Sequence, residues 1–253
     1  MLDPGGQVPP VETHYRTIPI RAAGDLHALC MQVVQSLRLG PGARVLDLGA
    51  GEGALSQRLI DAGFDVHAVE LVPGRHRSSA PCNQMDLNRP FAELSGQLFE
   101  LVVAIEVIEH LENPRHFIRE CLRVVSPRGH LLVTSPNVHS WYSRIHFLRT
   151  GHLTWFDEKD YVESGHITPI FSWQMSQIAR ELGAEVVNRW NTSDALLWAR
   201  LGDTWTSKLK RKSFYMSALY PFMRSEKSGE INVFLLRRHV SPQSSGEHLG
   251  AGA

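Results

Sequence analysis

The sequence predicts an α/β fold built on a doubly wound, mostly parallel sheet. Short runs of β-branched residues alternate with helix-length amphipathic segments along the first half of the chain. A glycine-rich segment separates the first such run from the helix that follows it. The run 99–105 is the most hydrophobic stretch of the chain, which is typical of a parallel strand buried on both faces. With 253 residues, 43% of them hydrophobic and 21% charged, the chain has enough apolar material for one large core.

Each element follows from periodicity and from the residues that stop it. Gly40-Pro41-Gly42 ends the first helix and Gly63 ends the second. Helices are expected at 22–39, 54–62, 113–125, 173–182 and 194–223, and strands at 45–48, 66–69, 85–87, 99–105, 130–134, 185–190 and 230–237.

Composition divides the chain into one domain with two appendages. Residues 1–20 are expected to form a flexible arm, residues 21–240 the domain, and the Ser/Gly-rich residues 241–253 a disordered tail. Within the domain, 138–170 is an aromatic, histidine-rich lid insertion, and 194–224 is a basic amphipathic helical segment.

Charge and cysteine content limit the possible functions. Lys and Arg together number 26, as do Asp and Glu, so no overall field favours nucleic acid. Three scattered cysteines indicate neither a disulfide framework nor a metal-binding pair. Neither a secretory signal nor a membrane-spanning run is present, which predicts a cytoplasmic protein.

The glycine loop predicts a nucleotide cofactor. Glycines between a strand and a helix allow close backbone approach to a ligand beyond the strand's carboxyl end. Gly49, Gly51 and Ala54, with Glu70 further on, also satisfy a dinucleotide pattern. Asp47 inside the strand, the tight spacing of Gly49, Gly51 and Gly53, and Asp86-Leu87 favour S-adenosylmethionine instead.

At these residues the chain resembles class I S-adenosylmethionine-dependent methyltransferases, over 22–137 and again over 171–190. The resemblance implies a Rossmann-like, seven-stranded sheet whose last strand is antiparallel, a place that 231–236 would fill. It implies that Glu70 binds the ribose hydroxyls and that Asp86 and Leu87 border the adenine. The implied cofactor contacts are Asp47, Gly49, Ala50, Gly51, Glu70, Leu71, Asp86, Leu87, Ile105 and Glu106.

A second motif, Glu106-x-x-Glu109-His110, follows the strand 99–105. If a helical turn begins at Glu106, these three side chains share one face and point into the cofactor crevice. Two carboxylates and an imidazole suit a divalent cation or a general base, and we interpret them as the catalytic residues.

This motif resembles those of two groups of methyltransferases. One is the ubiquinone-biosynthesis O-methyltransferases; the other is the small-RNA 3′-end 2′-O-methyltransferases, whose motif binds a metal with a later histidine. The second resemblance implies a metal site, for example for Mg²⁺, at Glu106, Glu109, His110 and His166.

The acceptor is expected to be a small-molecule, glycan or lipid-linked hydroxyl. The lid insertion also resembles bacterial methyltransferases associated with surface-polysaccharide assembly. The basic, aromatic residues 200–224 favour peripheral contact with the inner face of the membrane. Two alternatives stay open: a metal-dependent RNA 2′-O-methyltransferase, and a non-catalytic module that binds a nucleotide cofactor.

Overall fold

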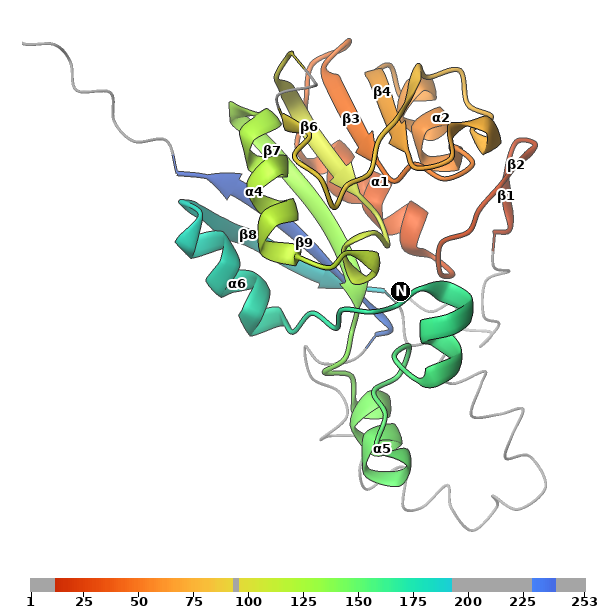
Figure 1. Ribbon diagram of the computed structural model, residues 1–253. Coiled ribbons are helices and arrows are strands. Elements are labelled where there is room, and N and C mark those ends of the chain that lie inside the picture. Colours follow the sequence, from red (N-terminus) through yellow and green to blue (C-terminus); the bar gives the residue numbers. More distant parts are fainter. Residues whose placement is uncertain (1–11, 93–95, 193–228, 240–253) are drawn as a thin grey trace, which may run out of the picture.

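A computed structural model describes residues 12–92, 96–192 and 229–239, and its centre is a seven-stranded sheet (Figure 1). The strand order is β5-β4-β3-β6-β7-β9-β8. Neighbours from β5 to β7 pair in parallel, whereas β9 is antiparallel to both β7 and β8. The expected doubly wound sheet with an antiparallel last strand is therefore confirmed. The strands are β3 (Arg44–Leu48), β4 (Asp65–Glu70), β5 (Cys82–Gln84), β6 (Phe99–Ala104), β7 (Val125–Pro136), β8 (Ala184–Asn191) and β9 (Ile231–Arg238).

Both faces of the central strands are buried, and alternate residues supply two separate cores. In β6, Val102 and Ala104 face one core while Leu101 and Val103 face the other. The first core contains side chains of α4 (Pro114–Val124) and α6 (Ser172–Glu181). The second contains side chains of α1 (Leu26–Ser36) and α2 (Ala54–Asp61). The helices thus form one layer on each face of the sheet (Figure 1).

Several predicted elements have different bounds in the structure. The strand expected at 130–134 is β7, which begins at Val125. The third strand, β5, lies at 82–84 instead of 85–87, so Asp86 and Leu87 fall in the loop after it. The first helix begins at Leu26, because residues 21–25 run as an extended connection and turn. The predicted helix 194–223, the basic segment 194–224 and the tail 241–253 lie outside the described residues.

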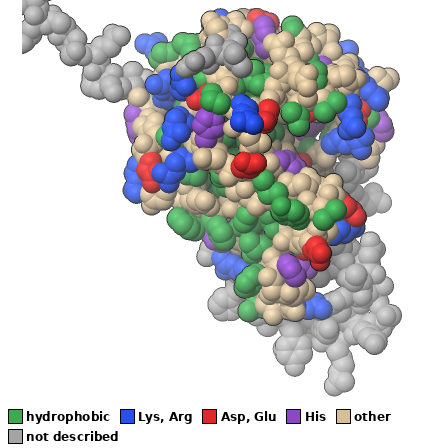
Figure 2. Space-filling model, viewed as in Figure 1, with side chains coloured by type: hydrophobic (Ala, Val, Ile, Leu, Met, Phe, Trp, Pro, Cys, Tyr) green, Lys and Arg blue, Asp and Glu red, His purple; other side chains and the backbone are tan. Residues whose placement is uncertain are grey.

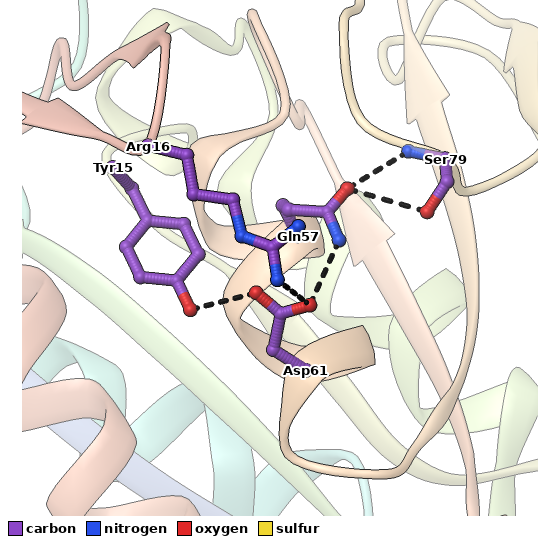
Figure 3. Close-up of polar contacts among 5 residues, drawn as sticks. All are labelled: Tyr15, Arg16, Gln57, Asp61 and Ser79. Atoms are coloured by element: carbon purple, nitrogen blue, oxygen red, sulfur yellow. Dashed lines mark hydrogen bonds and ion pairs between the residues drawn. The ribbon is translucent and has the colours of Figure 1, made fainter.

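The arm expected to be loose is a packed strap over residues 12–23. Its strands β1 (His14–Tyr15) and β2 (Ile18–Pro19) form an antiparallel hairpin. Asp61 at the end of α2 accepts a hydrogen bond from the Tyr15 hydroxyl (2.7 Å) and pairs with Arg16 (2.8 Å) (Figure 3). Arg58 pairs with Glu12, and its guanidinium lies 4.1 Å from the centre of the Tyr15 ring.

Part of the 138–170 insertion is helical and projects away from the sheet (Figure 1). It contains α5 (Trp141–Thr150), which the Ser140 side chain caps and Gly151 ends, and a short π-helical turn, Asp160–Ser164.

Acidic and basic side chains are interspersed on the face shown in Figure 2. Among the described helices, none combines the length and the hydropathy that crossing a bilayer requires.

Candidate active site

Two adjoining cavities open at the carboxyl ends of β3, β4 and β6. The larger has a volume of about 1090 Å³ and the smaller about 410 Å³. They share Gly49, Gly51, Glu106 and His110, so they are two parts of one cleft. All ten residues expected to contact the cofactor lie on its walls. This position is the one at which parallel α/β sheets bind ligands.

The glycine loop forms the floor shared by both cavities. Gly49 has φ +70°, and a Cβ atom on it would lie 2.6 Å from a methyl group of Val107. Only glycine meets both conditions, because left-handed φ and lack of space each disfavour a side chain. Its N–H donates to the carbonyl of Val69 on β4 (2.8 Å), which fixes the loop against the neighbouring strand.

Asp47 lies beneath this loop on β3 and is 2% exposed. Burial raises the pKa of its carboxyl to about 6, while the hydrogen bond from the Ser56 hydroxyl (2.6 Å) opposes the rise. A buried carboxylate with one partner retains acceptor capacity for a ligand in the smaller cavity.

The acidic residues at the next two strand ends line the larger cavity. Glu70 accepts hydrogen bonds from the N–H of Gly51 (2.7 Å) and of Leu71 (2.9 Å), so its carboxylate is held against the glycine loop. Asp86 accepts from the N–H of Asn88 (2.9 Å) and stands at the same cavity with Leu87. The cleft therefore has an acidic end formed by residues that the sequence singled out.

Glu106 occupies a strained position at the junction of the two cavities. Its φ is +53°, which is uncommon for a residue with a side chain. Its N–H donates to Thr134 Oγ1 (2.8 Å), and its Oε2 accepts from the N–H of Ala23 on the strap (3.1 Å). Burial raises the pKa of this carboxyl to about 7, with the Ala23 hydrogen bond opposing and Glu230 adding to the rise.

The helical turn predicted to begin at Glu106 is shorter than expected. Only Ile108–His110 form a turn, and it is of the 3-10 type. Glu106 precedes it in left-handed backbone, so the expected single helical face for Glu106, Glu109 and His110 is wrong. Strand β6 and its loop nevertheless place Glu106 and His110 on the walls of the same cleft.

Glu109 and two histidines form the group of side chains best suited to a cation. One ligand atom each from Glu109, His110 and His166 lies within 4.8 Å of the others. Within the described ranges this is the sole group of three or more such residues. The structure thus brings together three of the four residues implied as metal ligands, whereas Glu106 stands outside the group.

The bonding of this cluster fixes what each side chain can offer. Glu109 is 1% exposed, and neither carboxylate oxygen has a hydrogen-bond partner. His110 Nδ1 lies 3.2 Å from the carbonyl oxygen of Gly165, and His166 Nδ1 lies 2.8 Å from that of Trp155. Because a carbonyl only accepts, each Nδ1 carries the proton and each Nε2 keeps its lone pair.

The charge states in the cluster follow from burial. Burial raises the pKa of the Glu109 carboxyl well above its ordinary value. It also lowers the pKa of His110, and the neighbouring His166 lowers it further. Without a cation, burial therefore disfavours the charged forms of both the His110 imidazole and the Glu109 carboxyl group.

The strap and the 138–170 insertion complete the smaller cavity, and sequence reasoning missed the strap. Pro19, Arg21 and Ala23 form one wall, and Trp155 and His166 from the insertion form another. Residues 19–20 belong to the arm expected to be loose and residues 22–23 to a segment expected to be helical, so no pattern in the sequence indicated a cavity wall here.

Comparison with known proteins gives a consistent result. Residues 22–189 match a family described as "Methyltransferase domain". A ubiquinone biosynthesis O-methyltransferase from Azorhizobium caulinodans is 34% identical over 112 residues, 41% of this chain. One from Xanthomonas campestris is 35% identical over 107 residues, 38% of this chain. The match spans 44% of the length of each relative.

Solved structures share the fold at low identity. A SAM-dependent methyltransferase from Archaeoglobus fulgidus has a TM-score of 0.60 and 17% identity, over 85% of this chain and 95% of the other. Magnesium protoporphyrin IX methyltransferase from Synechocystis, with bound SAH, has a TM-score of 0.56 and 14% identity, over 85% and 83%. At these identities the likeness is one of architecture.

Proposed function

Because the chain belongs to the methyltransferase domain family, we propose that it transfers the methyl group of S-adenosylmethionine to a hydroxyl oxygen. The acceptor is a small molecule, a glycan or a lipid-linked precursor. The observation that carries this proposal is the position of the Glu109–His110–His166 cluster, whose two histidines line the cavity that contains the glycine loop. The names of the curated relatives support transfer to oxygen.

The cofactor fits the cleft from its acidic end to the glycine loop. Glu70 and Asp86 supply acceptors for the ribose hydroxyls and the adenine amino group, and the Gly49–Gly51 backbone borders the methionine part. Arg21 of the strap lines both cavities beside this loop, and its guanidinium would bind the cofactor's carboxylate. With the cofactor bound in this way, Glu106 and His110 would border its methyl group.

The cluster also fits a divalent cation. A buried carboxylate without partners is costly unless a positive charge compensates it, and Glu109 has both oxygens free for that purpose. The carbonyls of Gly165 and Trp155 accept hydrogen bonds from the two imidazoles at Nδ1, so the lone pair of each Nε2 is available to a metal ion. Glu109, His110 and His166 would hold the ion, which when bound polarises a hydroxyl oxygen and lowers its pKa.

Glu106 is the remaining group that can accept the acceptor's proton. Its pKa of about 7 suits a general base at neutral pH, and it lines both cavities. In the transfer, the hydroxyl oxygen forms a bond to the methyl carbon as the carbon–sulfur bond breaks. The hydroxyl proton passes to Glu106, and S-adenosylhomocysteine leaves as a neutral thioether.

The test uses methyl-labelled S-adenosylmethionine with the full chain and a cell extract, split into organic-soluble, water-soluble small-molecule and RNase-sensitive fractions. We expect label in one of the first two fractions, and its loss with a chelator. Label released by RNase would replace this proposal with RNA 2′-O-methylation. No labelled product in any fraction would leave the non-catalytic alternative.

Two variants separate cofactor binding from transfer. Asp47→Ala should abolish binding of S-adenosylhomocysteine in titration calorimetry, whereas NAD should not bind the unaltered chain. Glu106→Gln should lower kcat about 10²-fold while the protein still binds S-adenosylhomocysteine. Full activity of Glu106→Gln would remove this residue from the proton transfer.

A further inference from the structure

Three arginines gather around one carboxylate at the mouth of the larger cavity. Glu52 in the glycine loop accepts two hydrogen bonds from Arg21 at one oxygen (2.8 and 3.1 Å). Its other oxygen lies 3.3 Å from Nε of Arg77. The hydrogen bond from Arg21 lowers the pKa of Glu52, and the nearby charges of Arg77 and Arg75 lower it further. The corner therefore carries more positive than negative charge.

These guanidinium groups keep unused donors that face solvent and the cleft. The Glu52 side chain is 10% exposed, whereas those of Arg21 and Arg77 are 79% and 60% exposed. No carboxylate of the described residues lies within ion-pair distance of Arg75, although its side chain lines the cavity. A guanidinium presents five donors in a planar fork, so the three arginines offer about fifteen donors, and one carboxylate leaves most of them to solvent or to a ligand.

The surplus charge is local. The whole chain is formally neutral, and the same cavity also contains the acidic residues Glu70 and Asp86. The arginines therefore add a basic site to a cavity whose other charged side chains are acidic, and such a site favours an anionic group on a ligand.

The cofactor alone does not account for this corner. S-adenosylmethionine brings a single carboxylate, and one guanidinium fork is enough to bind it in bidentate fashion. The two parts of the cleft, of about 1090 and 410 Å³, together exceed the roughly 300–1,000 Å³ of a typical small-molecule site. The larger part also contains His110, so a second ligand held at the arginines shares the cleft with the reacting groups.

We infer that Arg75 and Arg77 form a subsite for an anionic group, a phosphate or a carboxylate, on the methyl acceptor, next to Arg21, which is left to the cofactor's carboxylate. This inference rests on the proposed function and narrows its substrate class. Phosphate and carboxylate both match the guanidinium fork, so the arginines predict a negatively charged group, and the experiment distinguishes phosphate from carboxylate.

The experiment titrates the full chain, saturated with S-adenosylhomocysteine, with inorganic pyrophosphate and separately with benzoate in a calorimeter. We expect saturable binding of one anion, and the tighter of the two identifies the group. Arg75→Ala should weaken that binding at least tenfold, and Arg75→Lys, which keeps the charge without the fork, should weaken it less.

Arg89→Ala is the matched control. Arg89 is also a surface arginine beside the cleft, with its side chain 80% exposed and near one acid, Asp86, but it does not line the cavity. Its substitution should change anion affinity less than twofold. Because Arg75 and Arg89 are both solvent-facing, neither alanine variant removes a buried contact.

Two results would overturn the inference. One is that neither anion binds at millimolar concentration, or that Arg75→Ala binds it as well as the unaltered chain does. The other is that Arg75→Ala weakens S-adenosylhomocysteine itself to the same degree, which would assign the arginines to the cofactor. Failure of the unaltered chain to bind S-adenosylhomocysteine would contradict the proposed function instead, so the two failures are distinguishable.

Discussion

At the scale of single residues, Glu109 carries a buried, unpartnered carboxyl group in the candidate cation cluster. Its carboxyl group lies inside the protein without a hydrogen-bond partner, and removing such a group from water costs several kcal/mol unless it is neutral or paired. Its backbone carbonyl, by contrast, accepts from the N–H groups of Ile167 and Thr168 (both 3.0 Å). The chain therefore fixes the backbone of Glu109 firmly while leaving its side chain free for a ligand.

Glu109→Gln should consequently stabilise the metal-free protein and abolish its response to metal. In chelator at pH 8 we expect the variant's Tm to exceed that of the unaltered chain by a few degrees, since about 1 kcal/mol corresponds to roughly 2–4 °C at this size. Added Mg²⁺, Mn²⁺ or Zn²⁺ should raise the Tm of the unaltered chain alone. Thermal unfolding measures both effects.

Glu112→Gln is the control for this substitution, because Glu112 is exposed on the same loop. Its Tm should stay within a degree or so, as surface substitutions usually change stability by less than about 0.5 kcal/mol. An equal metal-induced rise in Glu109→Gln and the unaltered chain would place the cation elsewhere.

Asp47 makes stability depend on pH. Burial raises its pKa from 3.8 to about 6, so the folded protein binds this proton more tightly than the unfolded chain does. The favourable contribution is complete below pH 3.8 and is lost as pH rises toward 6, on the order of 3 kcal/mol in all.

Asp47→Asn should therefore flatten the stability profile between pH 4 and 6, while its amide oxygen still accepts from Ser56. Urea unfolding at a series of pH values measures this profile. An unchanged slope in the variant would assign the pH dependence to other groups.

The sequence identified the acidic and glycine residues of the site because each stands at a strand end, where chain order alone determines position. Local backbone was harder to predict. The spacing of Glu106 and Glu109, three residues apart, predicted a helical turn. In the structure Glu106 has left-handed backbone, and its N–H donates a hydrogen bond to Thr134 on β7. That contact joins residues far apart in sequence, so no local pattern reports it.

At the scale of elements, the strap is held mainly by surface interactions. Ile18 is its one buried hydrophobic residue among those described, and its other anchors are ion pairs and hydrogen bonds at α2, Glu52 and Glu106. Exposed pairs contribute roughly 0–1 kcal/mol each, so the strap can release without unfolding the domain. Because Ala23 donates to Glu106, strap release would also free that carboxylate.

Asp61→Ala should loosen the strap more than it destabilises the fold, because Asp61 binds Tyr15, Arg16 and Gln57 at once (Figure 3). We expect trypsin to cleave at Arg16 and Arg21 several-fold faster, with a small change in Tm. Mass spectrometry of timed digests measures the rates. Asp65→Ala, which removes an exposed carboxylate near His67 only, should leave them unchanged.

The strap and α5 were beyond sequence reasoning for a common reason. Two-residue strands and a helix with most of its residues exposed carry weak periodicity, since neither buries a continuous apolar face. Elements that bury such a face, such as α4, were located to within a few residues.

At the scale of the whole molecule, the sheet was predictable because both of its faces are buried. Runs such as Leu101-Val102-Val103 must serve two cores at once, which permits little besides a central parallel strand. The family match and the fold of the solved structures agree with that prediction.

The core on the α4–α6 side should dominate global stability. Phe117 on α4 is fully buried and packs against Phe91, with ring centres 6.1 Å apart. Phe117→Ala should lower the free energy of unfolding by about 3–5 kcal/mol through lost burial and the cavity left behind. Urea denaturation measures it, with Leu148→Ala, 84% exposed on α5, as the control. A decrease in the free energy of unfolding no larger than that of Leu148→Ala would contradict this prediction, because it would mean that neighbouring side chains fill the space that Phe117 leaves.

The position of β9 also has a consequence for how the protein folds. Strand β9, the last described strand, lies between β7 and β8 in the sheet. Until β9 pairs, β7 and β8 each have an edge without hydrogen-bond partners. Pairing between such distant segments is slow, because a long loop must close before any contact forms. Exposed apolar edges of this kind are where chains associate wrongly. Pulse-labelled hydrogen exchange should therefore show the β7 amides that bond to β9 becoming protected after those of β3 and β6, and association between chains should be greatest in this interval.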